Sequence, residues 1–279
     1  MYPRMPEDSR AAWALPASEL PDRLETRLPG RWSLVEWLPS VDSTNRHLLD
    51  RDDLEPGRYH VCVAREQTAG RGRRGRAWIS RPEQSLTFSL ARALGPGEPA
   101  SPGLTLAAGV ALARGLSECG FEGHGLKWPN DLVTSGDAKL AGILVEARGD
   151  GTGGLAGALV VGVGMNLSGA ASLGLDRNVA DLAALDGPVA VTPVDLLAAV
   201  LPRLVLAWED FRAGGLIPFV EDFRMLDRLR GRRIEVLETG QTGQALGIDP
   251  ADGALLMECD RDIVRLYSGD VSVRAPGHG

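Results

Sequence analysis

Hydrophobic and polar positions alternate in short runs along most of this chain, which is the pattern of half-buried β-strands. Such runs, bounded by turn residues, predict six strands between Trp32 and Val163. The predicted strands are Ser33–Trp37, His60–Arg65, Ser85–Arg92, Leu126–Val133, Leu140–Arg148 and Leu155–Val163. A mixed or antiparallel sheet is the frame that these strands favour.

Helical spacing of apolar residues interrupts the strands at three places. The predicted helices are Ser43–Asp50, Leu104–Cys119 and Pro193–Arg212. Thr192 suits the N-cap of the last helix, although Pro202 lacks an N–H donor and is expected to kink or split it. These elements indicate an α+β fold, with a mixed, largely antiparallel sheet flanked by helices.

The pattern changes after Leu229, where only short strands separated by turns are predicted. These strands are Arg232–Glu238, Gly243–Ile248, Ala254–Cys259 and Ile263–Tyr267. They predict a small β-barrel of roughly 45 residues. We therefore expect an N-terminal arm at 1–30 with a short helix near Ala17–Leu28, a main domain at 31–228, and the barrel with its tail at 229–279.

Composition places the chain among soluble globular proteins, with 44% hydrophobic and 24% charged residues. No apolar run approaches the roughly 20 residues of a membrane-spanning helix, and Met1–Arg10 has no signal-peptide core. A cytoplasmic location is therefore expected, without a membrane partner. Cys62, Cys119 and Cys259 lack the spacing of metal ligands, so neither a zinc site nor a disulfide framework is indicated.

The formal net charge of −7 argues against a protein that coats nucleic acid, yet Gly70–Arg76 carries four arginines in seven residues. This loop matches the G-x-G-x-x-G pattern of dinucleotide sites. It lacks their strand-turn-helix context, because Glu66–Ala69 separates it from one predicted strand and another strand follows it. A loop that folds over a phosphate-bearing ligand, a solvated basic loop and a nucleic-acid patch all remain open.

Two further clusters combine polar residues with local structure signals. Asp42–Asn45 precedes a predicted helix, so its side chains either cap that helix or bind a polar small molecule. Lys127–Asp131 places a lysine in a predicted strand, where an ammonium needs an anionic partner such as a ligand. Pro129 cannot donate to a strand ladder, so the strand should lie at an edge or be distorted there.

The runs Lys139–Glu146 and Val160–Leu167 complete the set. Glycines in the second run allow either a ligand or a neighbouring strand to approach its backbone closely. If turns flank the first run, the two runs pair in a meander that brings Lys139 roughly opposite Gly164.

These runs reproduce five motifs in a fixed order between Val41 and Asn166: serine-threonine-asparagine, Q-x-x-G-R-G-R-x-G-R, K-W-P-N-D, K-L-x-G-I-L and G-x-G-x-N. Together they resemble the biotin–protein ligase family, and Ser268–Arg274 is similar to the closing strand of that family. The resemblance implies a class II synthetase-like, biotin/lipoate ligase fold with an SH3-like C-terminal barrel. We expect the monofunctional type without DNA binding, because 1–30 is too short for a winged helix.

The resemblance also implies an activity. Family members form biotinyl-5′-AMP and pyrophosphate from biotin and ATP with Mg²⁺, then transfer biotin to a lysine of a biotin carboxyl carrier protein or domain. No tightly bound prosthetic group and no metal ligand from the protein are implied. The family resemblance leaves both a monomer and a homodimer open.

Site residues follow from the matched motifs. The resemblance implies a biotin site of Ser43, Thr44, Asn45, Gln67, Gly70, Arg71, Gly72, Arg73, Lys127 and Gly142. It implies an ATP or adenylate site of Arg71, Arg73, Arg76, Trp78, Lys127, Asn130, Lys139 and Asn166. Lys127 and Arg73 are expected to be catalytic, with Lys127 contacting the reacting carboxylate and phosphate.

Two other functions compete with this hypothesis. A lipoate–protein ligase shares the reaction and the fold, although the polar run Ser43–Asn45 and the arginine-rich loop favour biotin. A nucleic-acid-binding module would use the Gly70–Arg76 loop, but the chain offers no recognition helix and no basic sheet studded with aromatic residues.

Overall fold

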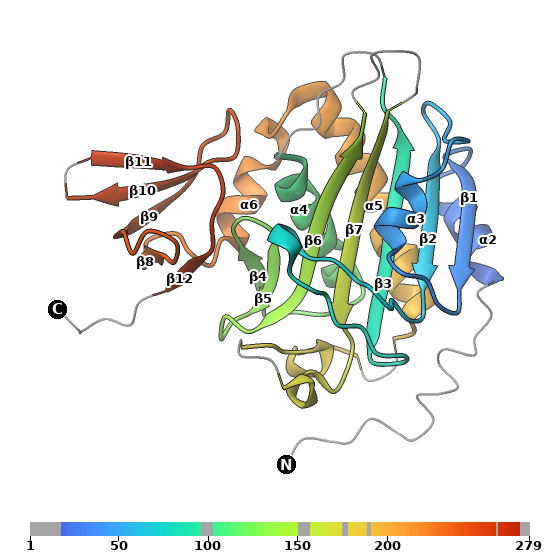
Figure 1. Ribbon diagram of the computed structural model, residues 1–279, viewed down its shortest axis with the longest axis horizontal. Coiled ribbons are helices and arrows are strands. Elements are labelled where there is room, and N and C mark those ends of the chain that lie inside the picture. Colours follow the sequence, from blue (N-terminus) through green and yellow to red (C-terminus); the bar gives the residue numbers. More distant parts are fainter. Residues whose placement is uncertain are drawn as a thin grey trace.

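The computed structural model describes residues 18–95, 103–149, 157–174, 178–188, 191–260 and 262–273. Figure 1 shows a large sheet with helices packed behind it, one short helix in front of it, and a smaller sheet at one side. The predicted arm before residue 18 lies outside the described residues, as do the tail after 273 and the start of the predicted strand Leu155–Val163. None of the described helices is long and apolar enough to cross a membrane.

The large sheet has seven strands in the order β1-β2-β3-β7-β6-β5-β4. Only β1 and β2 pair in parallel, and every other neighbouring pair is antiparallel, as the sequence predicted. The strands are β1 Trp32–Leu38, β2 Tyr59–Ala64, β3 Ser85–Ala93, β4 His124–Lys127, β5 Asp131–Thr134, β6 Lys139–Arg148 and β7 Ala158–Asn166.

Helices cover the two faces of this sheet unequally (Figure 1). The long helices lie behind it, whereas α3 packs in front against β2, β3, β6 and β7. The α-helices are α2 Glu19–Arg27, α3 Thr44–Leu49, α4 Gly103–Glu118, α5 Pro193–Gly214 and α6 Val220–Leu226. Short 3-10 turns are η1 Arg73–Gly75, η2 Ala170–Leu173, η3 Leu182–Ala184 and η4 Ile217–Phe219.

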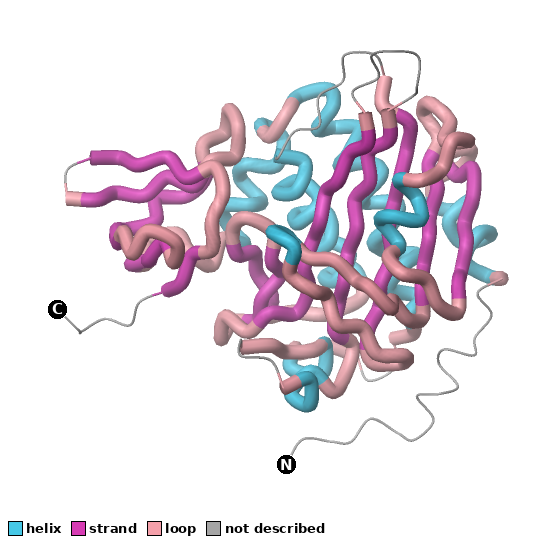
Figure 2. The backbone as a smooth tube through the Cα atoms, viewed as in Figure 1, coloured by secondary structure: helices cyan, strands magenta, loops and turns pink. Residues whose placement is uncertain are grey.

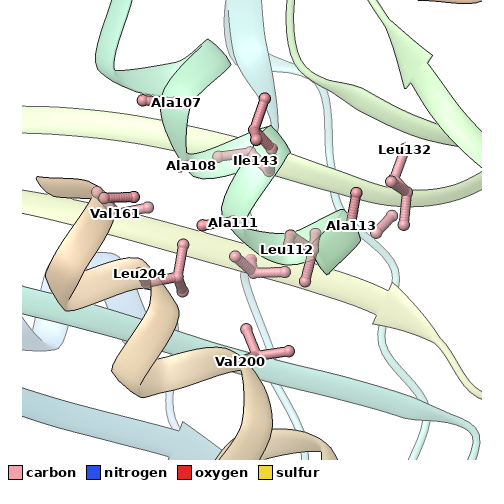
Figure 3. Close-up of a cluster of buried hydrophobic side chains, with 14 of the residues drawn as sticks. Ala107, Ala108, Ala111, Leu112, Ala113, Leu132, Ile143, Val161, Val200 and Leu204 are labelled. Atoms are coloured by element: carbon pink, nitrogen blue, oxygen red, sulfur yellow. The ribbon is translucent and has the colours of Figure 1, made fainter. Parts of the chain in front are cut away.

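The main core lies between the sheet and the pair α4 and α5. Figure 3 shows small side chains of α4, such as Ala107 and Ala111, among larger ones from α5 and the strands. Gly115 approaches α5 so closely that a Cβ there would lie 2.7 Å from Val200 Cγ2. The small residues of α4 therefore allow α5 to pack tightly behind the sheet, which leaves the front face for other uses.

Three expectations need correction. The predicted strand Leu126–Val133 is two strands, because a turn containing the cis peptide bond Trp128–Pro129 divides it and leaves β4 at the sheet edge. Pro202 lies inside α5 without splitting it. Finally, Gly142 pairs with Gly164, so the predicted register between β6 and β7 was wrong by three residues.

The C-terminal sheet is antiparallel, with five strands in the order β11-β10-β9-β8-β12. Its strands are β8 Arg233–Val236, β9 Thr242–Ile248, β10 Leu255–Cys259, β11 Asp262–Leu266 and β12 Val271–Val273. Trp128 in the divided turn donates from Nε1 to the carbonyl oxygen of Gly253, at 3.0 Å. This buried contact fixes the small sheet beside the β4 edge of the large one.

Candidate functional site

A cavity that is open to solvent lies on the front face of the large sheet. Its floor is formed by β6 and β7, one side by α3, and its cover by the Gly70–Arg76 loop, which Figure 2 shows crossing in front of these strands. The lining residues are Ser43, Thr44, Asn45, Gln67, Arg71, Gly72, Arg73, Arg76, Ala77, Trp78, Asn130, Asp131, Lys139, Gly142, Ile143, Leu144, Gly162, Val163, Gly164 and Asp270.

The structure brings most of the predicted site residues together here. Three of them do not line the cavity: Gly70, Lys127 and Asn166. Gly70 closes the base of the loop, where a Cβ would lie 2.5 Å from the carbonyl oxygen of Trp78. Asn166 is buried and donates to the carbonyl oxygen of Ala180 at 2.9 Å, so its amide holds the chain beyond β7.

The polar run at the start of α3 caps the helix and lines the cavity. Ser43 is the N-cap, since its hydroxyl accepts from the backbone N–H of Arg46. Thr44 donates from its backbone nitrogen and from Oγ1 to Gln67 Oε1, at 2.8 and 3.1 Å. Because Ser43, Thr44 and Gln67 also line the cavity, the helix start presents polar groups to whatever the cavity holds.

Asn45 is held by hydrogen bonds within the protein. Its Nδ2 donates to Glu146 Oε2 at 2.7 Å and to the carbonyl oxygen of Leu144 at 3.2 Å. Its Oδ1 accepts from Ser89 Oγ at 2.6 Å, and the Ser89 side chain is fully buried. The Asn45 amide therefore has partners on both of its polar atoms and fixes α3 to the sheet.

Ser89 and Glu146 belong to this network but were not predicted. The pattern of β3 contains a signal for the serine, because Ser85, Thr87 and Ser89 alternate with large apolar residues. Alternation places all three polar side chains on one face of the strand, which here is the front face. Glu146 carries no comparable local signal, since it becomes a partner only through the pairing of distant segments.

The arginine-rich loop is closed by its own backbone. Gly72 donates to the carbonyl oxygen of Arg76 at 2.6 Å, and Trp78 donates to that of Gly70 at 2.9 Å. Arg74 at the tip has φ 58°, a left-handed conformation that costs energy for a residue other than glycine. Burial, followed by the charge of Arg74, lowers the pKa of Arg73, which remains far above neutral pH in any guanidinium.

Trp78 lies against the glycines of the floor. A Cβ on Gly164 would come within 2.3 Å of its ring atom Cε2, so the bare backbone of β7 is what admits the indole. The indole Nε1 is buried and has no hydrogen-bond partner among the described residues. A buried donor of this kind inside a cavity is available to a ligand.

The two lysines occupy different places. Lys139 lines the cavity and donates from Nζ to Asp131 Oδ1 at 2.5 Å. Lys127 lines a smaller pocket, which shares Asn130, Asp131 and Ile143 with the lining of the cavity. A signal for both exists in the sequence, because these are its only lysines among 30 Lys and Arg residues. Lysine and arginine differ in shape and hydration, so a lysine in a chain that otherwise uses arginine marks a position that suits a compact ammonium group.

Among the described residues, the carboxylates that line the cavity already have cationic partners. The described residues contain no cluster of three or more histidine, cysteine, aspartate or glutamate side chains that could hold a metal ion. Asp131 and Asp270 are the carboxylates in the cavity lining, and they pair with Lys139 and Arg76.

Comparison with known proteins agrees with this arrangement. The model described as "Biotin/lipoate A/B protein ligase family" matches residues 37–166, and "Biotin protein ligase C terminal domain" matches 231–274. The "Bifunctional ligase/repressor BirA" of Salmonella typhimurium is 36% identical over 260 residues, which cover 91% of this chain and 78% of that protein. The "Biotin--[acetyl-CoA-carboxylase] ligase" of Paracoccus denitrificans is 42% identical over 142 residues, which cover 49% of this chain and 56% of that protein.

A solved structure is also similar. The biotin protein ligase from Aquifex aeolicus in complex with biotin and ATP superimposes with a TM-score of 0.71 at 27% identity. The match covers 87% of this chain and 99% of that chain.

Proposed function

This chain belongs to the biotin/lipoate protein ligase family, and from that premise we propose that its cavity activates biotin with ATP and transfers it to a carrier protein. An oxygen of the biotin carboxylate attacks the α-phosphorus of ATP, which forms biotinyl-5′-AMP and releases pyrophosphate. The ε-amine of a lysine on a biotin carboxyl carrier domain then attacks the acyl carbon. The bond to the phosphate oxygen breaks, AMP leaves, and the amine loses a proton as the amide forms.

The observation that carries this proposal is the composition of one cavity. Bare glycine backbone and the side chain of Leu144 form its floor, with Gly162 and Gly164 on the same face of the sheet, and suit the rings and chain of biotin. Ser43, Thr44 and Gln67 at the start of α3 suit the polar ureido group. Asn45 acts as a positioning residue, because its amide is already bonded to Ser89, Leu144 and Glu146 in three directions.

Cations surround the other part of the cavity. Arg71, Arg73 and Arg76 come from the loop, and Lys139 comes from β6. Two anions, the carboxylate and the α-phosphate, must meet during activation, and these side chains offset their repulsion. We assign the contact to the reacting groups to both lysines, because Lys139 lines the cavity, and Lys127, for which the motif resemblance implied this role, lies directly opposite Asp131 on the same face of the sheet.

The loop excludes water from the product of the first step. Its backbone hydrogen bonds place three guanidinium groups over the cavity, and α3 and the sheet enclose the cavity on its other sides. An acyl-adenylate is readily hydrolysed, so a cover that keeps water out preserves it for the acceptor lysine. Mg²⁺ is proposed to arrive on the phosphates of ATP, where it supplies charge neutralisation.

Pyrophosphate exchange into ATP tests the first step. Purified protein is incubated with ATP, Mg²⁺ and labelled pyrophosphate in the presence of biotin, lipoate or neither. Exchange that requires biotin supports the proposal, exchange that requires lipoate replaces it with lipoate ligation, and no exchange with either acid refutes it. Transfer is then measured on a biotin carboxyl carrier domain, with a carrier whose target lysine is replaced by arginine as control.

A further inference from the structure

Two ion pairs join the arginine-rich loop to the C-terminal sheet. Arg74 pairs with Glu238, in the turn after β8, and Arg76 pairs with Asp270, just before β12. Residues 76 and 270 are 194 positions apart in the chain, so only the packing of the two sheets brings them together. The side chains remain 35 to 49% exposed, which is typical of pairs that exchange partners readily.

The two carboxylates are held as one unit. Both carboxylate oxygens of Glu238 accept from the backbone N–H of Asp270, at 3.0 and 3.3 Å. Leu237 donates from its backbone nitrogen to the carbonyl oxygen of Asp270 at 2.9 Å. The turn after β8 and the start of β12 therefore present both acidic side chains to the loop in fixed positions.

The two pairs differ in their relation to the cavity. Arg76 and Asp270 both line it, whereas Arg74 and Glu238 are not among its lining residues. Burial acts to raise the pKa of Asp270, but the hydrogen bond from Arg76 and the charges of Arg74 and Arg73 hold it below its ordinary value. An ionised carboxylate in a cavity that receives a triphosphate repels that ligand and competes with it for the same guanidinium.

We propose that Asp270 and Glu238 position the loop in two different ways, a proposal that rests on the adenylating function above. Asp270 occupies Arg76 until a phosphate of ATP displaces it, so that the arginine is oriented before the nucleotide arrives. Glu238 keeps Arg74 outside the cavity throughout, and this contact holds the loop tip down in its left-handed conformation. The C-terminal sheet thereby supplies contacts that hold the loop over the cavity, in addition to the hydrogen bonds within the loop backbone.

The exchange at Arg76 is tested with Asp270→Asn, which keeps the shape and an acceptor oxygen but removes the charge. The apparent KM for ATP in biotin-dependent exchange should fall about three- to tenfold, because a like charge is removed from the phosphate site. Glu258→Gln is the matched control, since it removes one exposed carboxylate from the same sheet far along β10. A KM that rises, or that changes no more than in the control, overturns the exchange at Arg76.

The anchor at Arg74 is tested with Glu238→Gln in enzyme without ligands. Trypsin should cut the bonds after Arg73 and Arg74 about two- to fivefold faster than in the parent, as expected for loss of one partly exposed ion pair. Fragments are identified by mass, and Glu258→Gln should cleave at the parental rate. Equal cleavage of all three proteins overturns the anchor.

A second readout follows free biotinyl-AMP released during turnover, which should increase in Glu238→Gln. The exchanged pair Arg74→Glu with Glu238→Arg should return release toward the parental value, because it restores opposite charges at the two positions. Failure of this rescue, with both proteins folded, counts against the ion pair. The trypsin experiment uses no substrate, so it can succeed or fail independently of pyrophosphate exchange in the parent, which tests the function itself.

Discussion

Lys139 Nζ lies 2.5 Å from Asp131 Oδ1, in a contact that crosses from β6 to β5 at the wall of the cavity. The lysine side chain is only 16% exposed, so its charge is poorly solvated and Asp131 compensates it. A carboxylate or phosphate in the cavity can share this ammonium, which has three donor hydrogens. The contact thus keeps a compact cation in place before an anionic substrate binds.

Lys139→Ala is therefore expected to slow biotin-dependent pyrophosphate exchange by more than about 100-fold, since removal of an oxyanion-type donor commonly costs 3 to 4 kcal/mol. Lys127→Ala is the matched comparison and should lose activity to a similar extent, because Lys127 lies opposite Asp131 on the cavity face of the sheet. Thermal unfolding of both variants checks that they fold. Near-parental exchange in either folded variant would show that its lysine does not contact the reacting groups.

Gly162→Ala tests the packing of α3 on the floor. A Cβ at this position would lie 2.0 Å from Asn45 Oδ1, so the asparagine must move and its bond from Ser89 must lengthen or break. We expect a loss of about 1 to 3 kcal/mol in the free energy of unfolding, as for other overpacked sites, together with a higher KM for biotin. Urea denaturation and the exchange assay measure these two quantities.

Gly136→Ala is the control for that substitution. Its Cβ would meet only Thr134 Oγ1, at the ordinary contact distance of 3.8 Å. The unfolding free energy should stay within about 0.5 kcal/mol of the parent. Equal effects at the two glycines would mean that crowding against Asn45 is not the cause.

Local patterns were sufficient to predict most elements, and most of the predicted site residues line one cavity. The N-cap residue type of Ser43 and the periodicity after it predicted α3, and the structure confirms the helix at Thr44–Leu49. The ordered motifs also converge on one cavity, because they lie on adjacent strands, at the start of α3 and on the loop. Such features depend on neighbours in the chain, which a sequence displays directly.

Features that depend on distant pairing were missed or misplaced. The edge position and the distortion that Pro129 predicted are confirmed, although the apolar run around it was interpreted as one strand. The predicted register between β6 and β7 was wrong by three residues, because similar apolar side chains permit several alignments of the two strands. Glu146 and Asp270 became visible as site components only after the sheets were assembled.

The cap of α5 provides a test of local stability away from the cavity. Thr192 Oγ1 accepts from the backbone N–H of Asp195 at 3.1 Å, and Asp195 Oδ2 accepts from that of Thr192 at 3.0 Å. Thr192→Ala should lower the free energy of unfolding by about 1 kcal/mol, within a range of about 0.5 to 2. Thr192→Ser keeps the hydroxyl and should retain most of the stability, so an equal loss in both would implicate the methyl group instead.

His60 provides a test of pH dependence. The side chain is 3% exposed on β2, and neither ring nitrogen has a hydrogen-bond partner among the described residues. Burial, and after it the charge of Arg51, lowers its pKa below the ordinary 6.5, against the opposing charges of Asp53, Glu55 and Glu36. The unfolded chain therefore takes up a proton near pH 6.5 that the folded chain takes up only at lower pH.

The contribution of His60 to the free energy of unfolding should consequently be complete above pH 6.5. It should fall as the pH drops below that value, until the folded histidine is itself protonated. The loss from this one group approaches about 1.4 kcal/mol per pH unit in that window. His60→Gln cannot take up the proton, so its unfolding free energy should decline less steeply as the pH falls. The measurement is urea denaturation from pH 8 to 5, with each protein referred to its own value at pH 8. His124, whose pKa burial also lowers, accounts for part of the remaining slope, which His60→Gln with His124→Gln should reduce further. An unchanged slope in His60→Gln would show that other groups govern the acid sensitivity of the fold.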